Sequence, residues 1–319
     1  MPVRSKSVAN PSRSTRIAWI GVGLLTLIWG FNWIASKVAT HDSGPFTFSA
    51  HRYIVGTLVL FLILAWRRTD LKPTPWLPTI AIGLTQTAAF QALIQWALMS
   101  GGAGKTALLA YTMPFWVVPL AWWWVHEKPG LRHWLCIAVA VAGFICVVEP
   151  WKPLGAPRSI LMAVLSGLAW AAATVLSKRL FQRHPEITPL RLTAWQMLIG
   201  TVALVILALT THERAVDWTR AYIGAVLYTG ILGSGVAWVL WAVVVQRLAA
   251  NVAGLTSLAV PVAVVLFGWG LLGNRPSGME GVGVVLIAIA LLALNLWSRH
   301  AAARPSPPEP TARHADAPH

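Results

Sequence analysis

The chain has few charged residues and few cysteines. Asp, Glu, Lys and Arg make up only 11% of its 319 residues, whereas a soluble globular domain carries about a quarter. This composition excludes an ordinary water-soluble protein. The two cysteines, Cys136 and Cys146, lie in one apolar stretch, where a helix would hold their Cα atoms about 15 Å apart. We therefore expect two free thiols that pack as small side chains, and no disulfide framework.

Long hydrophobic stretches fill most of the chain. A helix needs about 20 residues to cross roughly 30 Å of hydrocarbon, and only helices or closed barrels satisfy their backbone hydrogen bonds in lipid. A barrel would show segments of alternating hydrophobicity about ten residues long, whereas these stretches are uniformly apolar. We predict an all-α integral membrane protein with ten transmembrane helices, at about 17–39, 46–65, 76–99, 104–125, 131–149, 159–180, 189–211, 220–245, 251–272 and 278–298.

The Lys and Arg residues between these helices indicate the orientation of the chain. With the N-terminus in the cytoplasm, the inner segments hold 16 of them and the outer segments hold six, while Lys37, Arg52 and Arg191 fall within or beside spans. Because cytoplasmic loops carry the excess of positive charge, we predict that both termini are cytoplasmic, in a bacterial inner membrane. The net charge of +15 then faces anionic membrane lipid, and no nucleic-acid partner is expected.

The two halves of the chain correspond to each other at offsets of 141 to 147 residues. In chain order, the aligned pairs include Trp29 with Trp170, Lys37 with Lys178, Pro45 with Pro189, Gly56 with Gly200, Gly83 with Gly230 and Pro114 with Pro261. Each half holds five spans, and because five is odd, the second half enters the membrane from the opposite side. We predict two inverted five-helix repeats, 17–149 and 159–298, around a central cavity. A basic cytoplasmic segment at 1–16 and a disordered cytoplasmic tail at 299–319 flank them.

Short motifs recur at set places in this pattern. The sequence W-G-F-N-W occupies 29–33 and is followed by Lys37, while Pro114 of the fourth span is followed thirteen residues later by Glu127. The same spacing links Pro261 to Asn274. These features resemble the drug/metabolite transporter superfamily, EamA type, which usually has glutamate at both places. The resemblance covers about residues 17–298 and implies a ten-helix bundle with a central cavity that exports, or sometimes takes up, small metabolites.

Polar side chains at similar depth in the first half predict where a substrate binds. Counted at 1.5 Å per residue, four of them lie about 10 Å below the outer surface: Asn32, Arg52, Gln91 and Tyr111. Gln86 lies about one turn deeper, and Gln95 lies about one turn shallower. Polar residues in lipid usually face a cavity or a partner helix. The predicted cavity residues of this half are Asn32, Trp33, Arg52, Gln86, Gln91, Gln95 and Tyr111.

Arg52 has the most specific binding chemistry of these residues. A guanidinium stays protonated and presents five donors in a planar fork, so in a cavity it would hold a carboxylate or phosphate with two parallel hydrogen bonds. The alternative is that Arg52 extends outward to lipid headgroups. In the second half, Gln196 aligns with Arg52 and is also expected to line the cavity, and aromatic residues are denser. We expect Trp170, Tyr228 and Trp238 to line an aromatic wall, with helix packing or an interfacial belt as the alternative.

Three further residues have predicted structural roles. Pro114 and Pro261 are expected to kink their helices in mid-span and to act as hinges, with static packing as the alternative. Glu127 ends the fourth span on the inner side, where we expect it to pair with a basic neighbour or to cap a neighbouring helix. None of the ten acidic residues lies in mid-membrane, although ion-coupled carriers often use a buried carboxylate. Coupling, if any, would use His51, a carboxylate near a membrane end or the charge of the substrate.

The sequence therefore predicts a secondary transporter of small organic metabolites, such as amino acids or related compounds, that exports its substrate by alternating access. Two alternatives stay open: a membrane-embedded lipid-modifying enzyme, and a receptor or scaffold without transport. The first would need an acid, base or metal cluster at a membrane face, and the second has no evident use for an inverted repeat. We expect no cofactor, no resident metal and no catalytic residue. The expected partners are a small-molecule substrate and membrane lipid.

Overall fold

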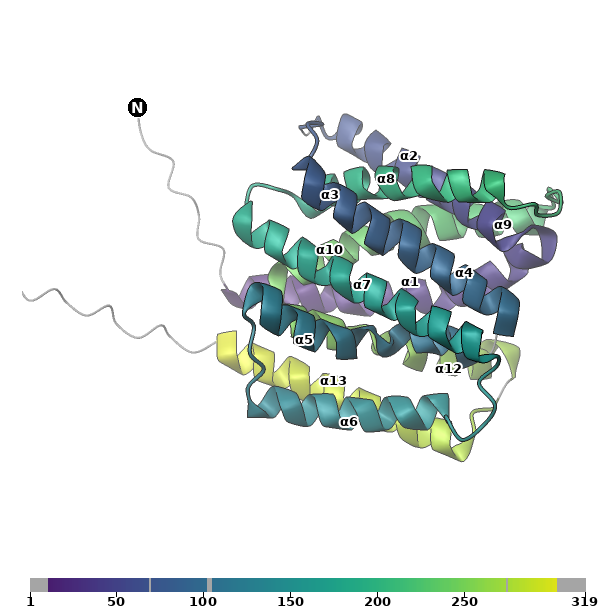
Figure 1. Cartoon of the computed structure of the whole chain (residues 1–319). Helices are drawn as coiled ribbons and strands as arrows, with labels where there is room; N and C mark the ends of the chain where they lie inside the picture. Colours follow the sequence, from purple (N-terminus) through teal and green to yellow (C-terminus); the bar gives the residue numbers. More distant parts are fainter. Residues whose placement is uncertain (1–10, 69, 102–104, 274, 303–319) are drawn as a thin grey trace, which may run out of the picture.

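Helices alone make up the computed structural model, which describes residues 11–68, 70–101, 105–273 and 275–302 (Figure 1). The elements in chain order are α1 (Pro11–Asp42), α2 (Pro45–Trp66), α3 (Trp76–Ile82), η1 (Gly83–Ala89), α4 (Phe90–Gly101), η2 (Lys105–Thr112), α5 (Met113–Val125), α6 (Leu131–Val148), α7 (Pro157–Arg183), α8 (Pro189–Thr210), α9 (Arg220–Tyr228), η3 (Thr229–Val236), α10 (Ala237–Arg247), α11 (Ala250–Thr256), α12 (Ala259–Leu272) and α13 (Gly278–Ala302).

Ten apolar spans of membrane length are found in the described part of the chain, which confirms the predicted fold class. Their bounds agree with the prediction within three residues, except that the fourth span begins at Leu108 rather than at 104. Helix α1 begins at Pro11, inside the segment that we expected to precede the first helix, and α13 continues to Ala302. The rest of the expected disordered tail, 303–319, lies outside the described residues.

Local sequence signals explain where several helices begin. Pro45, Pro157 and Pro189 open α2, α7 and α8, at positions where a missing N–H costs nothing and the fixed φ suits a helix. Thr188 and Thr219 cap α8 and α9, because each side chain accepts a hydrogen bond from the backbone N–H three residues later. These signals divide the apolar sequence into helices that all run across the same layer (Figure 1).

Irregular segments occur at corresponding places in the two halves. The third and eighth spans each contain a π-helical segment, η1 and η3, after which α4 and α10 begin 147 residues apart, at Phe90 and Ala237. Extra residues of this kind in a helix often mark functional sites. The sequence pattern did not predict them, because the apolar runs continue through both segments. Their matching positions agree with a duplication of one five-helix unit.

The prolines proposed as hinges do not lie in the middle of regular helices, so this part of the prediction is corrected. Pro114 is the second residue of α5, directly after the 3-10 segment η2. Pro261 is the third residue of α12, which follows a two-residue break after α11. A proline ring clashes with the carbonyl four residues earlier, so in each span the regular helix is interrupted just before the proline. Whether these interruptions act as hinges stays a prediction.

Helices α2 and α8 pack against each other. Thr57 and Thr201, which correspond at an offset of 144 residues, share a hydrogen bond of 3.0 Å between their hydroxyl oxygens. Directly before the threonine on each helix, Gly56 lies against the backbone of η3 and Gly200 against the backbone of η1. Because equivalent residues meet each other here, this contact marks the place where a two-fold axis between the halves would pass.

Candidate functional site

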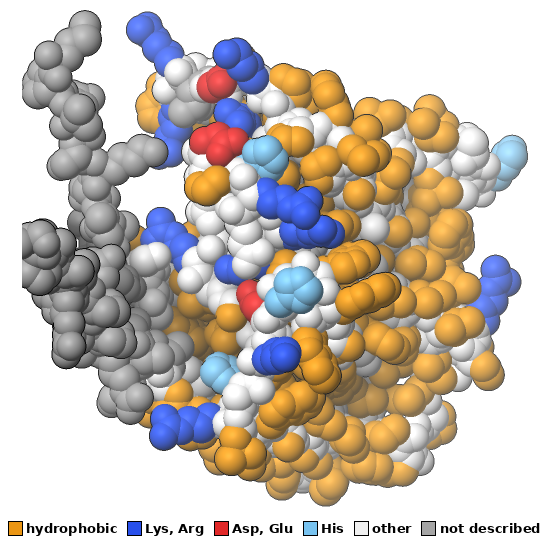
Figure 2. All heavy atoms as spheres, turned by 60° about the vertical axis from the view of Figure 1, so that its left-hand side comes forward, with side chains coloured by type: hydrophobic (Ala, Val, Ile, Leu, Met, Phe, Trp, Pro, Cys, Tyr) orange, Lys and Arg blue, Asp and Glu red, His pale blue; other side chains and the backbone are white. Residues whose placement is uncertain are grey.

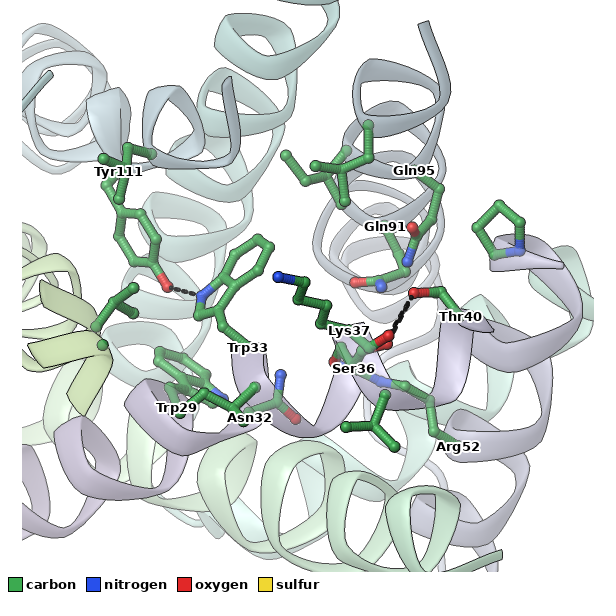
Figure 3. A pocket seen from close by; sticks show the side chains of 18 of the residues that line it. Trp29, Asn32, Trp33, Ser36, Lys37, Thr40, Arg52, Gln91, Gln95 and Tyr111 are labelled. Atoms are coloured by element: carbon green, nitrogen blue, oxygen red, sulfur yellow. Dashed lines mark hydrogen bonds between the residues drawn. The ribbon is translucent and has the colours of Figure 1, made fainter. Parts of the chain in front are cut away.

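A cavity of about 1110 Å³ lies among helices of both halves. We call it the chamber, and Figure 3 shows many of its lining side chains. The lining reaches one end of the bundle at Asp42, Pro45, Met99 and Pro276, which we call the open end. The lining residues come from α1, α2, α4, η2, α7, α10, α12 and α13, together with the segment before α13 and the first residues of α9.

Arg52 lies on α2 and lines the chamber while remaining 6% exposed. Its Nε donates a hydrogen bond of 3.2 Å to the hydroxyl of Ser234 in η3. Its guanidinium carbon lies 5.0 Å from the centre of the Tyr53 ring and 5.9 Å from that of Phe48. These contacts hold the side chain inside the bundle, so the alternative of a side chain extended to lipid headgroups does not describe this structure. The Arg52 guanidinium is available as an anion-binding group within the chamber.

Amides contribute neutral polar groups to the same chamber. Gln91 and Gln95, one turn apart on α4, both donate to the hydroxyl of Ser49, at 3.3 and 2.9 Å. Asn32 on α1 is 8% exposed, and its Oδ1 has no hydrogen-bond partner among the described residues. This oxygen lies against Gly233 of η3, where an added Cβ would clash with it, so it packs between helices and does not face the chamber.

Aromatic rings form the floor of the chamber. Trp29, Trp170 and Trp238 meet edge to face, with ring centres 4.9 to 5.8 Å apart. Such contacts are favourable beyond the burial of the rings themselves. Indole N–H groups also find partners here: Trp29 donates to the Gly233 carbonyl at 3.0 Å and Trp238 to the Tyr53 hydroxyl at 3.1 Å. The floor thus presents apolar ring surface beneath the polar groups above it.

Trp33 and Tyr111 extend this aromatic surface up one wall. The Trp33 indole N–H donates to the Tyr111 hydroxyl at 3.0 Å, as the dashed line in Figure 3 shows. Both residues line the chamber, as do Trp170 and Trp238. Of the eleven residues predicted to line a cavity, the structure therefore brings eight together: Asn32, Trp33, Arg52, Gln91, Gln95, Tyr111, Trp170 and Trp238.

Three of the predicted residues do not line the chamber. Gln86 is buried within the π-helical segment η1. The carbonyl oxygen of Gln196 accepts a 2.9 Å hydrogen bond from the Thr87 hydroxyl, and the Tyr228 hydroxyl donates to the Ile28 carbonyl at 3.1 Å. Gln196 and Tyr228 thus join helices to one another, and depth counted along the sequence could not show which side of a helix faces the chamber.

The chamber also contains residues that the sequence reasoning did not select. Ser36, Lys37, Thr40 and His41 continue the Asn32 face of α1 toward the open end. Ser36 and Lys37 follow Asn32 and Trp33 by four residues, and Thr40 and His41 follow them by eight, which is the spacing of one helical face and could have indicated them. Figure 3 shows Lys37 reaching into the chamber between Trp33 and the two glutamines of α4. Arg275 and Glu280 lie at the mouth, together with Asp42.

The opposite end of the bundle is held by polar contacts around Glu127, and we call it the closed end. One oxygen of Glu127 accepts hydrogen bonds from the backbone N–H groups of Ala250, at 2.6 Å, and Asn251, at 3.4 Å, and so caps the start of α11. The Lys178 ammonium donates to the carbonyls of Val245 and Leu248, at 3.2 and 2.6 Å. The helix-capping role expected for Glu127 is thus present in the geometry. Burial of this loop carboxyl raises its pKa, and the nearby Lys178 opposes the rise only in part.

Charges are distributed unevenly over the ends of the molecule. Figure 2 turns forward the end where α1 begins and α13 ends, and Lys and Arg side chains gather there while hydrophobic side chains cover the flank. The basic residues near this end include Arg67, Lys128, Arg179 and Arg183. Among the described residues, no three His, Cys, Asp or Glu side chains are placed together to hold a metal ion.

Comparison with known proteins relates the whole chain to one family. The model of the EamA-like transporter family matches twice, over residues 17–149 and 157–296. The uncharacterized transporter YoaV of Bacillus subtilis is 28% identical over 257 residues, which cover 78% of this chain and 87% of that protein. A probable amino-acid metabolite efflux pump of Salmonella typhimurium is 24% identical and covers 86% of this chain and 93% of its own length. A solved crystal structure with 21% identity has the same fold, with a TM-score of 0.76 over 91% of this chain and 99% of the other.

Proposed function

Because the chain belongs to the EamA-like transporter family, we propose that it exports small organic metabolites across the bacterial inner membrane by alternating access. The observation that carries this proposal is a chamber that is open at one end and closed by capped helices at the other. An inverted repeat can adopt two such states of similar energy, one open to each side. The two matches of the family model, each covering five spans, support this interpretation.

The open end faces the outside in this proposal. The basic end, which carries both termini, faces the cytoplasm because cytoplasmic segments hold most of the Lys and Arg residues. The chamber described above then belongs to an outward-open state. Reporters placed after Asp42 and after Asp70 should appear outside and inside, respectively. Finding both on one side would contradict the orientation and the number of helices between them.

The chemistry of the chamber favours a substrate that joins a carboxylate to an apolar body. Arg52 supplies a fixed guanidinium for the carboxylate. The tryptophan floor and the Trp33–Tyr111 wall supply apolar ring surface, and Asn32, Gln91 and Gln95 supply neutral hydrogen-bonding groups. The name of the Salmonella relative as a probable amino-acid metabolite efflux pump agrees with a substrate of this kind. Since no acidic residue lies in mid-membrane, coupling would use the charge of the substrate or a carboxylate near a membrane end.

Flux through the purified protein in liposomes tests this function. We would compare L-phenylalanine with L-phenylalaninamide, which lacks the carboxylate but keeps the ring. The wild type should carry phenylalanine, and Arg52→Ala should lower its flux about 100-fold while changing amide flux much less, since a charged hydrogen-bonded pair is lost only for the acid. Arg52→Lys should restore part of the flux, because lysine has charge but no planar fork.

Two results would contradict the proposal at different levels. Equal losses for the acid and the amide would show that Arg52 supports the structure and does not select anions. No flux of any compound in a broad metabolite panel, with well-folded protein, would favour a receptor, a scaffold or a membrane-embedded enzyme. A cysteine at position 52, with Cys136 and Cys146 replaced, should also react with a water-soluble thiol reagent if the chamber is filled with water.

A further inference from the structure

Two lysines occupy equivalent positions at opposite ends of the bundle. Lys37 on α1 and Lys178 on α7 correspond at an offset of 141 residues, as do Trp29 and Trp170. The ends of α1 and α7, Asp42 and Arg183, have the same offset. Lys178 lies at the closed end, whereas Lys37 lies in the chamber near the open end. The same side chain is therefore seen in two different surroundings within one structure.

At the closed end, Lys178 binds the last turn of α10. Its ammonium donates to the carbonyls of Val245 at 3.2 Å, Gln246 at 3.5 Å and Leu248 at 2.6 Å. The last carbonyls of a helix have no partner within the helix and carry the negative end of its dipole. One ammonium thus satisfies several of these carbonyls and attaches α7 to α10, which pack against each other.

At the open end, the equivalent residues line the same chamber. The offset of 147 residues that relates α4 to α10 makes Leu98 and Met99 the equivalents of Val245 and Gln246. Both residues line the chamber together with Lys37. Lys37 is exposed, and within the described part of the chain its ammonium has no hydrogen-bond or ion-pair partner, although its backbone carbonyl accepts from the Thr40 hydroxyl at 3.2 Å. Helices α1 and α4 also make at most a marginal contact there, unlike the equivalent pair α7 and α10.

We propose that Lys37 is a gate residue of the transport cycle, which binds the last carbonyls of α4 when the open end closes. In that state Lys37 would hold α1 against α4 as Lys178 now holds α7 against α10, while Lys178 would be released. This inference rests on the alternating access proposed above. It assigns Lys37 a role in closure, so Arg52 remains the cation that meets the substrate.

The chemistry of the two surroundings supports such an exchange. In the open chamber water solvates the Lys37 ammonium, and closure removes that water. A lysine ammonium excluded from water is costly unless other groups accept its hydrogen bonds, and the end of α4 supplies acceptors at the place where closure occurs. The flexible lysine side chain can follow the movement of the helices.

The surroundings of Lys178 at the closed end and of Lys37 at the open end, which we call the two gates, differ in one residue of the sequence. Glu127 caps α11 beside Lys178, and the equivalent position, 147 residues later, holds Asn274. Position 274 itself lies outside the described residues. The gate at the closed end thus has a carboxylate in addition to its lysine, whereas the other gate has the lysine and a neutral amide in sequence.

Distance measurements between spin labels test the proposal without any ligand. One pair of labels, at His41 on α1 and Met99 on α4, reports on the open end; both side chains are exposed. The equivalent pair, at Gln182 and Gln246, reports on the closed end. With protein in lipid nanodiscs, Lys178→Ala should shift the ratio of the two states about tenfold toward a short 41–99 distance and a long 182–246 distance.

The matching substitution should act in the opposite direction. Lys37→Ala should reduce the short 41–99 population about tenfold, and it should do the same in the Lys178→Ala background, where that population is largest. Lys37→Arg should largely retain the short population, because arginine also donates to carbonyls. Lys72→Ala, which removes an exposed cation between α2 and α3, serves as the control and should change neither distance.

The outcomes separate this proposal from the function on which it rests. If Lys178→Ala produces the second state but Lys37→Ala leaves its population unchanged, Lys37 is no gate residue, although alternating access stands. If both lysine variants shift the distances in the same direction, the proposed exchange is wrong. If no variant yields a second pair of distances, both the exchange and alternating access are contradicted.

Discussion

The two halves of the molecule build the same polar contact with different chemistry. In one, Arg52 of α2 donates to Ser234 of η3 at 3.2 Å. In the other, the equivalent residue of α8, Gln196, accepts a hydrogen bond of 2.9 Å from Thr87 of η1. Each contact joins the second helix of one half to the π-helical segment of the other. This polar contact is therefore present in both halves, whereas only one of the two contacts includes a positive charge.

This difference shows which features belong to the fold and which to the substrate. A small hydroxyl on the π-helical segment and a long polar side chain on the facing helix are enough to fasten the helices. A charged guanidinium is not needed to fasten the two helices, and of the two equivalent residues only Arg52 lines the chamber. We infer that the neutral pair keeps the architecture of the contact, while Arg52 adds selection for an anionic group.

Making the two contacts alike should therefore have the largest effect on transport. Arg52→Gln reproduces the neutral side chain of the other half, so the protein should fold normally but lose flux of a carboxylate substrate about 100-fold. Gln196→Ala, the matched change in the other half, should lower stability without this loss of selectivity. Flux of phenylalanine and its amide in liposomes measures both. A similar loss of flux in the two variants would mean that the contacts have equivalent roles.

The glycines beside the two-fold contact should differ in their tolerance of a side chain. An added Cβ at Gly200 would meet the Thr87 side chain and lie 2.6 Å from the Gly83 carbonyl oxygen, whereas at Gly56 its nearest neighbour, the Gly230 carbonyl oxygen, is 2.9 Å away. Gly200→Ala should cost about 3 kcal/mol of stability and Gly56→Ala about 1 kcal/mol. Gly224→Ala is the control, since nothing lies within 4 Å there. Thermal unfolding in detergent measures all three, and equal losses at 200 and 56 would contradict the comparison.

The closed end should respond to pH through Glu127. Burial raises the pKa of this carboxyl above its ordinary value near 4.5, so it takes up a proton more readily when the end is closed than when water reaches it. Protonation therefore favours the closed end: this stabilisation is complete below the ordinary pKa and is lost as the pH rises through the raised pKa. Between neutral pH and about pH 5, the long 182–246 population should fall several-fold.

Glu127→Gln removes the titrating group and provides the control for this response. The variant should show a flat pH profile for the 182–246 distance, together with slower turnover and near-normal substrate binding, because Arg52 lines the chamber and Glu127 does not. A pH response that persists in Glu127→Gln would assign it to another group. A complete loss of binding in well-folded Glu127→Gln would contradict a structural role for this residue.

The smallest effect is expected where α5 and α12 end. Their caps, His126 and Gly273, are equivalent residues and both adopt the left-handed conformation, with φ of 56° and 69°. This conformation costs a non-glycine residue about 1 kcal/mol. Gly273→Ala should therefore lower stability by about that amount, while His126→Gly should raise it by less, because glycine also gains freedom in the unfolded chain. Thermal unfolding of the two variants measures this, and the same sign for both would contradict it.

The sequence predicted the helices well because lipid leaves few alternatives to a continuous apolar helix. It could not predict the π-helical segments or the 3-10 segment before Pro114, since hydrophobicity does not change where the backbone does. Depth in the membrane could also be counted along the chain, and Asn32, Arg52 and Tyr111, which were expected at one depth, all line the chamber. The direction of each side chain around its helix depends on packing, so Gln196 was expected in the chamber and Lys37 was not.

The central claim is that one end of the chamber is open to the outside while its equivalent is closed. Leu108 and Leu255 correspond at an offset of 147 residues, but Leu108 lines the chamber and Leu255 is 2% exposed. Each would be replaced by cysteine, with Cys136 and Cys146 changed to alanine, and treated with an impermeant maleimide in right-side-out membrane vesicles. The cysteine at 108 should react at least about tenfold faster than the one at 255, as expected for solvent access at one site only. Equal rates, or reaction of position 108 only in inside-out vesicles, would contradict the claim.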